Sequence, residues 1–325
     1  MKNLVSKKDK IFIAGHKGMV GSSIIKILKN DGYKNLITCD KEEINLRDKS
    51  SLNNWFKINN PDIVIDAAAK VGGIGANSKN NDKFLLENLE IQNSLISISF
   101  ERKVKRFLFL ASSCVYPKQC RQPMLEEDLL NGKLEPTNEG YALAKIAGLK
   151  LCDYLNKLHD FDAFTLLPCN LYGKGDNFTL DKSHVLAALL VKFITAKKNN
   201  EKEVTCWGSG RPFREFLYVD DLARASIFAL EKWHPKNSKI ISESGEFLTY
   251  LNVGSGTDIT IADLADKISN IIKYEGEIIW DLNKQDGMAR KLMDSSRFKE
   301  LGWSPKYNLD EGIKTVIDYL IRNLF

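Results

Sequence analysis

The sequence predicts an α/β fold, with a doubly wound parallel sheet and a second, smaller α/β domain. Apolar runs of strand length alternate with amphipathic stretches of helix length through the first half of the chain. Three glycines, Gly15, Gly18 and Gly21, separate the first apolar run from the first helical stretch. The 325 residues, 43% of them hydrophobic, suffice for about two domains.

The first unit, residues 10–30, reads as a strand, a glycine turn and an amphipathic helix. Glycine lets the backbone turn sharply and approach a pyrophosphate, and the helix N-terminus offers free N–H groups to phosphate. The spacing GxxGxxG departs from the commoner GxGxxG, so a turn that only joins strand to helix is the alternative. With a buried strand before it and an apolar helix face after it, the turn predicts a dinucleotide-binding Rossmann unit.

The following elements continue the alternation. Strands are predicted at 35–39, 62–67, 106–111 and 163–167, and helices at 49–57, 82–101 and 141–159. Right-handed crossovers between parallel strands make such a sheet doubly wound.

The segment 173–210 interrupts this rhythm and contains a helical stretch at 184–198. A chain that leaves the sheet and returns commonly covers the carboxyl ends of the strands, where ligands bind. A helix at 220–231 and a strand at 249–253 follow, and then a smaller α/β region at 259–325. We therefore expect interleaved domains: 1–173 and 216–254 bind the dinucleotide, and 174–215 and 255–325 bind the substrate.

Composition argues against several function classes. The 47 basic and 42 acidic residues are dispersed, so the net charge of +5 predicts no nucleic-acid partner. Six cysteines without CxxC pairs and four histidines without ligand spacing predict reduced thiols and no metal site. We find no secretory signal and no apolar run of about 20 residues, and expect a cytoplasmic protein without membrane partners.

Tyr141 and Lys145 are four residues apart and share one face of a predicted helix. A YxxxK pair arises by chance roughly once in such a chain, so its position gives it weight. It follows a strand end that contains Ser112, and these side chains would meet above a nicotinamide ring. Tyr141 would donate a proton to a carbonyl oxygen, Lys145 would lower the phenol's pKa from about 10, and Ser112 would hydrogen-bond that oxygen.

At this point the chain resembles the extended short-chain dehydrogenase/reductases, and within them the GDP-L-fucose synthase family. The resemblance spans nearly the whole chain, in the motifs AGHKGMVG, AAAKVGGI, FLASSCVYPK, LEPTNEGYALAKIAGLKLC, NLYG, DNF, SHV, WGSG, REFLYVDD and RKLMD. Members of that family epimerise C3 and C5 of GDP-4-keto-6-deoxy-mannose and then reduce C4 with NADPH. The resemblance also implies a homodimer that pairs through the helices at 82–101 and 141–159.

The resemblance implies site residues by position. Cys114 and His184 would be the base and acid of epimerisation, beside the catalytic Ser112, Tyr141 and Lys145. The implied cofactor-binding residues are Gly15, Lys17, Gly18, Met19, Gly21, Lys41, Ala69, Tyr141, Lys145, Pro168, Leu171 and His184. The implied substrate-binding residues are Ser112, Asn170, Lys192, Trp207, Arg214 and Lys291. Cations in that group would clamp the pyrophosphate of a GDP-sugar.

The cofactor signal is mixed. Basic residues accept the 2′-phosphate of NADP, and Lys17 and Lys41 match basic positions of the family. Asp40 stands beside them, and an acid at this place usually binds the ribose hydroxyl of NAD. We expect NADPH rather than NAD, because of the basic pair and the biosynthetic direction.

The exact sugar stays open, because Thr179 and Leu180 replace the usual His-Pro of the family. The prediction is reduction of the C4 keto group of a GDP-4-keto-6-deoxy-hexose or a GDP-4-keto-heptose for surface polysaccharide, with or without C3/C5 epimerisation. The alternative enzyme is a nucleotide-sugar 4-epimerase or dehydratase with tightly bound NAD. A non-catalytic NADP sensor would not need Ser112, Tyr141 and Lys145 together.

Overall fold

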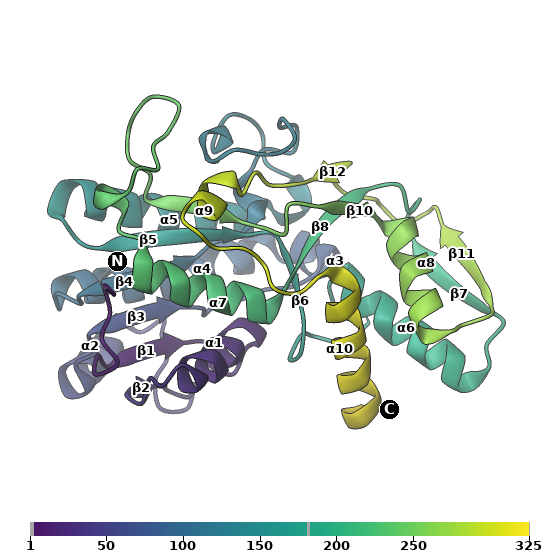
Figure 1. Cartoon of the computed structure of the whole chain (residues 1–325), viewed down its shortest axis with the longest axis horizontal. Coiled ribbons are helices and arrows are strands. Elements are labelled where there is room, and N and C mark those ends of the chain that lie inside the picture. Colours follow the sequence, from purple (N-terminus) through teal and green to yellow (C-terminus); the bar gives the residue numbers. More distant parts are fainter. Residues whose placement is uncertain (1–2, 181–182, 325) are drawn as a thin grey trace.

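The structure, a computed structural model, describes residues 3–180 and 183–324. Within these residues the centre is a six-stranded parallel sheet in the order β2-β1-β3-β4-β5-β9 (Figure 1). Its strands are β1 (Ile11–Ala14), β2 (Leu36–Ile37), β3 (Ile63–Asp66), β4 (Arg106–Leu110), β5 (Ala163–Pro168) and β9 (Tyr250–Val253). The strand order reverses between β1 and β3, and such a reversal is where this class of sheet binds its ligand.

Helices cover both faces of the sheet (Figure 1). On one face α1 (Met19–Asn30) packs against α7 (Val219–Lys232). On the other, α4 (Asn81–Glu101) packs against α5 (Glu139–His159) and α2 (Lys49–Asn59). Because both faces are covered, β1, β3, β4 and β5 are buried along their whole length. The doubly wound parallel sheet that the sequence predicts is confirmed.

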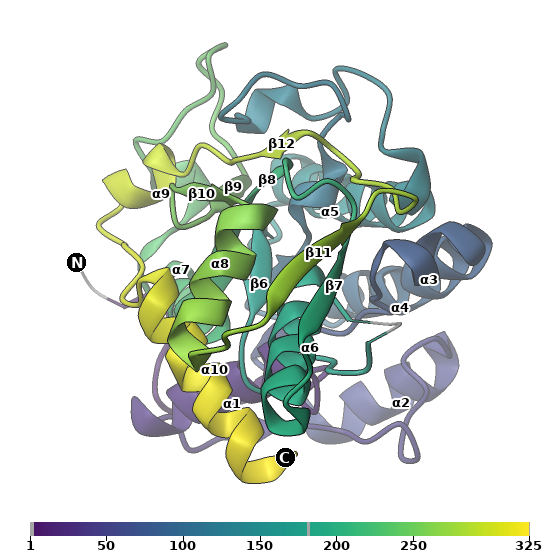
Figure 2. The same ribbon diagram turned by 90° about the vertical axis from the view of Figure 1, so that its right-hand side faces the viewer.

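A smaller α/β region lies at one end of this sheet (Figure 2). It has its own apolar cluster, formed by α6 (Val185–Asn199), α8 (Ile261–Ile272) and α10 (Leu309–Asn323) with neighbouring strands. There β7 (Glu203–Trp207) pairs in parallel with β11 (Glu277–Asp281), although about 70 residues separate them along the chain.

A second small sheet lies between the two apolar clusters. In it β8 (Phe213–Tyr218) pairs with β6 (Asn170–Tyr172), β10 (Asp258–Thr260) and β12 (Arg290–Lys291). The remaining short elements are α3 (Ile74–Lys79), α9 (Ser296–Glu300), η1 (Ser113–Val115), η2 (Glu126–Asp128), η3 (Pro136–Asn138) and η4 (Pro235–Asn237). Strand β12 therefore returns the C-terminal part of the chain to the region near the carboxyl ends of the central strands.

Local sequence explains where several helices begin. The side chain of Asp48 accepts backbone hydrogen bonds at the start of α2, and Thr260 does so for α8. Asn308 and Glu311 form a reciprocal capping box at the start of α10. These caps satisfy N–H groups that lack partners within the helix.

Candidate active site

Ser112, Tyr141 and Lys145 gather at the carboxyl end of β4. Ser112 follows that strand, and its Oγ accepts a hydrogen bond from the Cys114 amide (3.3 Å). Helix α5, which carries Tyr141 in its first turn, packs against η1. One turn along α5, Lys145 Nζ donates to the Leu110 carbonyl at the end of β4 (2.9 Å). The structure thus brings a hydroxyl, a phenol and an ammonium to one strand end.

The charge state of Tyr141 differs from the sequence-based expectation. Burial raises the pKa of the half-buried phenol well above its ordinary value, and the neighbouring Cys114 and Asp66 act in the same direction. Lys145 Nζ is 6.0 Å from the centre of the Tyr141 ring. Burial also lowers the pKa of Lys145, so the expected lowering of the phenol's pKa by this lysine is wrong here. A phenol that keeps its proton can still act as a proton donor.

Cys114 lies in a polar cluster formed by three segments. Asn138, at the end of η3, donates from Nδ2 toward Cys114 Sγ (3.4 Å). The buried Lys291 of β12 places its Nζ 3.6 Å from the same sulfur. His184 caps α6, and burial by the surrounding protein together with the charge of Lys291 lowers its pKa from 6.5. Lys291 therefore contacts Cys114 and also acts on the charge of His184.

The glycine turn forms a cradle at the start of α1. Gly15 has a φ of +78°, and a Cβ there would lie 2.6 Å from the Ala67 carbonyl oxygen. A Cβ at Gly21 would overlap the Gly15 carbonyl oxygen. Gly18 precedes the helix without a side-chain cap, so the first N–H groups of α1 are left for a ligand. The residues present fit a dinucleotide pyrophosphate.

The loop after β6 comes close to this cradle. A Cβ on Gly175 would lie 3.5 Å from the Cα of Met19, the first residue of α1. Other predicted cofactor residues lie on the same edge, since Ala69 follows β3, Pro168 ends β5 and Leu171 is in β6. The segment that begins at 173 therefore reaches the edge where the cofactor would bind, as the sequence predicts.

The end of β2 carries an ion cluster beside the cradle. The Asp40 carboxylate lies 2.7 Å from Lys17 Nζ and 3.2 Å from His16 Nε2. The hydrogen bond to Lys17 lowers the pKa of Asp40 and raises that of Lys17. Lys41 is exposed next to this cluster. Both lysines that the sequence assigns to a 2′-phosphate are present, but one of them is paired with an acid.

Trp207 offers an exposed aromatic face in the smaller region. It ends β7, and its side chain is 53% exposed. Lys192 Nζ lies 5.3 Å from the ring centre and donates to the Thr205 carbonyl (2.6 Å). Lys284 Nζ lies 5.1 Å from the same ring. An exposed indole flanked by two cations can stack on a nucleobase and attract its phosphates.

Two further predicted substrate residues are held by backbone groups. Arg214 donates to the carbonyls of Phe213 (2.7 Å) and Asp286 (3.3 Å), and burial lowers its pKa. Asn170 Nδ2 donates to the Glu215 carbonyl (2.8 Å), which ties β6 to β8. The amide of Asn170 thus has a structural bond as well as a position near the site.

Sequence reasoning missed four residues of this site. Asn138 contacts Cys114, Lys284 flanks Trp207, and Asp286 binds the Ser209 amide (2.7 Å) in the turn after Trp207. Asp66 is a fully buried acid at the end of β3. Asp66 could have been found from the sequence, because an acid at the end of the otherwise apolar strand IVID is unusual. The other three depend on contacts between distant segments.

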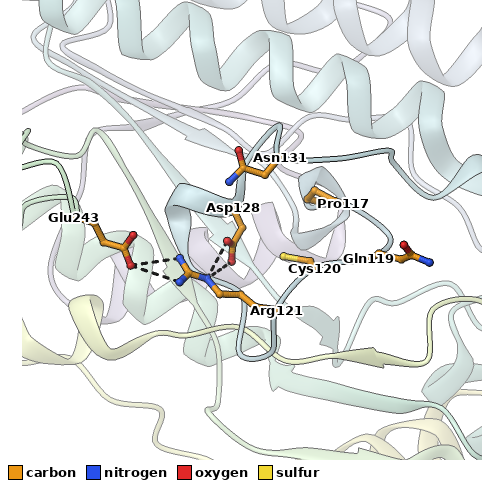
Figure 3. A pocket seen from close by; sticks show the side chains of 7 residues that line it. All are labelled: Pro117, Gln119, Cys120, Arg121, Asp128, Asn131 and Glu243. Atoms are coloured by element: carbon orange, nitrogen blue, oxygen red, sulfur yellow. Dashed lines mark hydrogen bonds and ion pairs between the residues drawn. The ribbon is translucent and has the colours of Figure 1, made fainter.

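A separate surface pocket of about 400 Å³ lies elsewhere, and none of the predicted site residues lines it (Figure 3). Its lining residues are Pro117, Gln119, Cys120, Arg121, Asp128, Asn131 and Glu243. Arg121 lies between Asp128 (2.9 Å) and Glu243 (3.5 Å), as the dashed lines in Figure 3 show. Burial raises the pKa of Cys120 to about 11, so the thiol stays protonated. This pocket offers no activated nucleophile.

Two features are absent from the part of the chain that the structure describes. Across 3–180 and 183–324, no three His, Cys, Asp or Glu side chains form a group that could hold a metal ion. Over the same ranges, no helix has the length and apolar character needed to cross a bilayer.

Comparisons with known proteins agree with this geometry. The model of the NAD dependent epimerase/dehydratase family matches residues 11–241. GDP-L-fucose synthase 1 of Arabidopsis thaliana is 44% identical over 322 residues, which cover 99% of this chain and 96% of that protein.

Solved structures of similar proteins have the same fold. A GDP-6-OMe-4-keto-L-xylo-heptose reductase from Campylobacter jejuni superposes with a TM-score of 0.91 at 32% identity, covering 98% of this chain and 99% of that one. The GDP-mannoheptose C4 reductase MlghC from Campylobacter jejuni, with NADP bound, gives a TM-score of 0.87 at 33% identity, with the same coverage. The chain therefore belongs to the NAD dependent epimerase/dehydratase family, in the branch that includes the GDP-L-fucose synthases.

Proposed function

We propose that this protein uses NADPH to reduce the C4 keto group of a GDP-4-keto-sugar. The observation that carries the proposal is the meeting of Ser112, Tyr141 and Lys145 at the end of β4, in a sheet whose first turn is built for a dinucleotide. Relatives that are GDP-L-fucose synthases and GDP-sugar C4 reductases, one with NADP bound, support the reaction and the cofactor.

Tyr141, Ser112 and Lys145 each have a separate role in the reduction at C4. Bound NADPH would supply the hydride that C4 accepts. Tyr141 gives its proton to the carbonyl oxygen, so the C4 ketone becomes an alcohol. Ser112 Oγ hydrogen-bonds that oxygen as charge develops on it, and Lys145 stabilises the phenolate that remains. Because the pKa of Tyr141 is raised, the phenol is protonated at neutral pH.

Epimerisation at C3 and C5 is the second part of the proposal. The C4 ketone acidifies the hydrogens on both adjacent carbons. Cys114 would take a proton from one face of the sugar and His184 would return one to the other. Lys291 Nζ lies 3.6 Å from Cys114 Sγ, so the sulfur is within hydrogen-bonding reach of a cation. The lowered pKa of His184 leaves its imidazole neutral at pH 7.

The nucleotide half of the substrate would bind in the smaller region. Trp207 would stack on the guanine, with Lys192 and Lys284 beside it. Arg214 would clamp the pyrophosphate, and Lys291 would do so from β12. The similar proteins include a GDP-L-fucose synthase and a GDP-heptose reductase. We therefore propose a 6-deoxy-hexose or a heptose as the sugar of the substrate.

The deciding experiment follows the reaction in D₂O. The protein is mixed with NADPH and each candidate GDP-4-keto-sugar, and loss of nicotinamide absorbance and deuterium at C3 and C5 are measured. NADPH oxidation with label at both carbons supports an epimerase/reductase, and oxidation without label supports a reductase alone. Tightly bound NAD that is never consumed would instead support the 4-epimerase or dehydratase alternative.

The assembly and location are also proposals. We infer a homodimer through α4 and α5, because these paired helices carry exposed apolar side chains: Leu86, Leu143, Tyr154 and Leu158. Light scattering of the wild type and of Leu158→Glu tests this. We further infer a cytoplasmic protein, since all six cysteines are free.

The domain division remains part of the proposal. The segments 1–173 and 216–254 would bind the cofactor, and 174–215 and 255–325 the substrate. Two separate apolar clusters support it, one around the central sheet and one around α6, α8 and α10.

A further inference from the structure

Asp66 shares a face of the central sheet with Lys145. Asp66 ends β3 and pairs directly with Phe109 of β4. Side chains of directly paired residues point to the same face of a sheet. Lys145 Nζ lies 4.5 Å from the centre of the Phe109 ring, above that face. The buried acid and the buried ammonium therefore lie in one layer, between the sheet and α5.

Neither of these two groups is fully satisfied. Asp66 has no solvent exposure and Lys145 only 3%. Asp66 Oδ1 accepts one hydrogen bond, from the Ala68 amide (3.1 Å), and Oδ2 has no partner among the described residues. Within the same residues, the Lys145 ammonium has one hydrogen-bond partner, the Leu110 carbonyl. A buried charge is costly unless an opposite charge compensates it.

We propose that Asp66 is a positioning residue whose carboxylate is the buried counter-charge that keeps Lys145 an ammonium beside Tyr141. Among the described residues the two groups do not bond to each other: Asp66 Oδ2 has no hydrogen-bond partner, and Lys145 Nζ donates to the Leu110 carbonyl. Asp66 therefore acts on Lys145 through space, and of these three residues Lys145 and Tyr141 are the ones assigned to the reduction itself. This inference rests on the proposed reduction at C4.

The electrostatics of the layer agree with this assignment. Burial raises the pKa of Asp66 to about 6, against the opposing effects of Lys145 and the Ala68 amide. Burial lowers the pKa of Lys145, and Asp66 and Cys152 oppose that change. From α5, Tyr141 also faces the carboxylate, and from η1 Cys114 faces Tyr141. Asp66 is thus ionised at neutral pH and protonated as the pH falls through about 6.

The proposed counter-charge makes the reduction rate depend on pH. Below about pH 6, Asp66 becomes neutral, but acid itself favours the Lys145 ammonium, so the counter-charge matters as the pH rises rather than as it falls. In Asp66→Asn the carboxylate is absent at every pH. The pKa of Lys145 then drops further, and the ammonium is lost at a lower pH than in the wild type. The reduction rate of the variant therefore declines at a lower alkaline pH than that of the wild type.

The first experiment needs no substrate or cofactor. The full chain is titrated from about pH 8 to pH 4, and infrared difference spectra follow the band of protonated carboxyl groups. The wild type should show a component that appears near pH 6 and shifts when aspartate is labelled with ¹³C. Asp66→Asn should lack it. Burial also raises the pKa of Asp176 to about 6, so Asp176→Asn is titrated as well. A component near pH 6 that Asp176→Asn keeps belongs to Asp66, even if Asp66→Asn does not fold.

The second experiment is the pH profile of C4 reduction at saturating NADPH. Asp66→Asn should be slower by on the order of tenfold at neutral pH, and its rate should decline at a lower alkaline pH than that of the wild type. Asp153→Asn is the control, because Asp153, on α5, is also a buried acid, but it pairs with Thr249 (2.6 Å) and Lys150 (3.0 Å). It should keep the wild-type limbs.

The inference is wrong if the wild type shows no carboxyl titration near pH 6, or if the rate of Asp66→Asn declines at the same alkaline pH as that of the wild type. Should the wild type reduce no GDP-4-keto-sugar, the proposed function fails instead. The infrared titration of Asp176→Asn then decides whether Asp66 is a buried titrating acid.

Discussion

The carboxylate of Asp40 lies 2.7 Å from the ammonium of Lys17, beside the turn that follows β1. Lys17 is 70% exposed and its hydrogen bond keeps Asp40 ionised, because it lowers the carboxyl's pKa. A 2′-phosphate that binds Lys17 must therefore compete with Asp40 and lie close to its negative charge. The pairing explains how an acid and a base at the ribose end can coexist in a chain that we expect to use NADPH.

Replacing Asp40 by Asn should strengthen NADPH binding. The amide keeps the shape but removes the charge that repels the 2′-phosphate, and an exposed pair of this kind changes affinity by about two- to fivefold. Dissociation constants are measured from dihydronicotinamide fluorescence. NADH lacks the 2′-phosphate, so its constant should not improve, and Lys17→Ala should weaken NADPH alone. Equal gains for both cofactors would contradict this account.

Tyr141→Phe should abolish reduction while NADPH still binds. Loss of a positioned proton donor costs about 10²- to 10⁴-fold in rate. Since burial raises the pKa of Tyr141 above its ordinary value of 10.0, the donor stays protonated as the pH rises to that value. The wild-type rate should therefore show no decline from phenol ionisation between about pH 8 and 10. Single-turnover absorbance traces across this range test both statements, and reduction by Tyr141→Phe at the wild-type rate, or a wild-type rate that falls across this range, would contradict them.

Cys114→Ser should separate epimerisation from reduction. A serine hydroxyl in the same place is a far weaker base than a thiolate, so exchange of sugar protons should fall more than C4 reduction does. Deuterium at C3 and C5, read by mass spectrometry, reports the first step, and NADPH oxidation reports the second. Cys120→Ser is the matched control, because that thiol lies in the separate pocket of Figure 3. Equal label in Cys114→Ser and the wild type would exclude Cys114 as the base.

His184 gives the same step a pH dependence. Because burial and Lys291 lower its pKa from 6.5, the imidazole is neutral at pH 7 and becomes charged only at lower pH. Exchange should therefore change its rate on the acid side of pH 6.5, and His184→Gln should remove that change. The initial rate of deuterium uptake between about pH 5 and 8 measures this.

Much of the fold and site could be predicted from local patterns. The buried strands and the glycine turn carry strong signals within a few residues, because a parallel sheet needs continuous apolar runs and a pyrophosphate cradle excludes side chains. The spacing of Tyr141 and Lys145 likewise fixes their common face, which the structure retains. These features depend on neighbours in the sequence.

The rest depends on distant contacts. Strand β7 pairs with β11, and β12 returns beside β8, although these strands are far apart in the chain. The sequence of each strand does not show which strand it pairs with. The placement of Lys291 next to Cys114 follows from that return. The pKa of Tyr141 was misjudged because helical spacing reports a shared face, whereas burial decides the charge. Lys145 instead points its ammonium at the Leu110 carbonyl.

Gly148→Ala should loosen the contact that holds α5 on the sheet. A Cβ at this buried position would lie 2.7 Å from Phe109 Cζ and 2.8 Å from Gln92 Nε2. Because Gln92 also binds the Ala144 carbonyl and Phe109 lies under Lys145, the helix must shift to admit the methyl group. We expect a loss of about 1–3 kcal/mol in unfolding free energy and slower C4 reduction, since Lys145 moves with α5. Urea unfolding and single-turnover rates measure the two effects, and Gly75→Ala is the control, because nothing lies within 4 Å of its new Cβ. If Gly148→Ala unfolded like that control, the close packing of α5 on β4 could not be what positions the lysine.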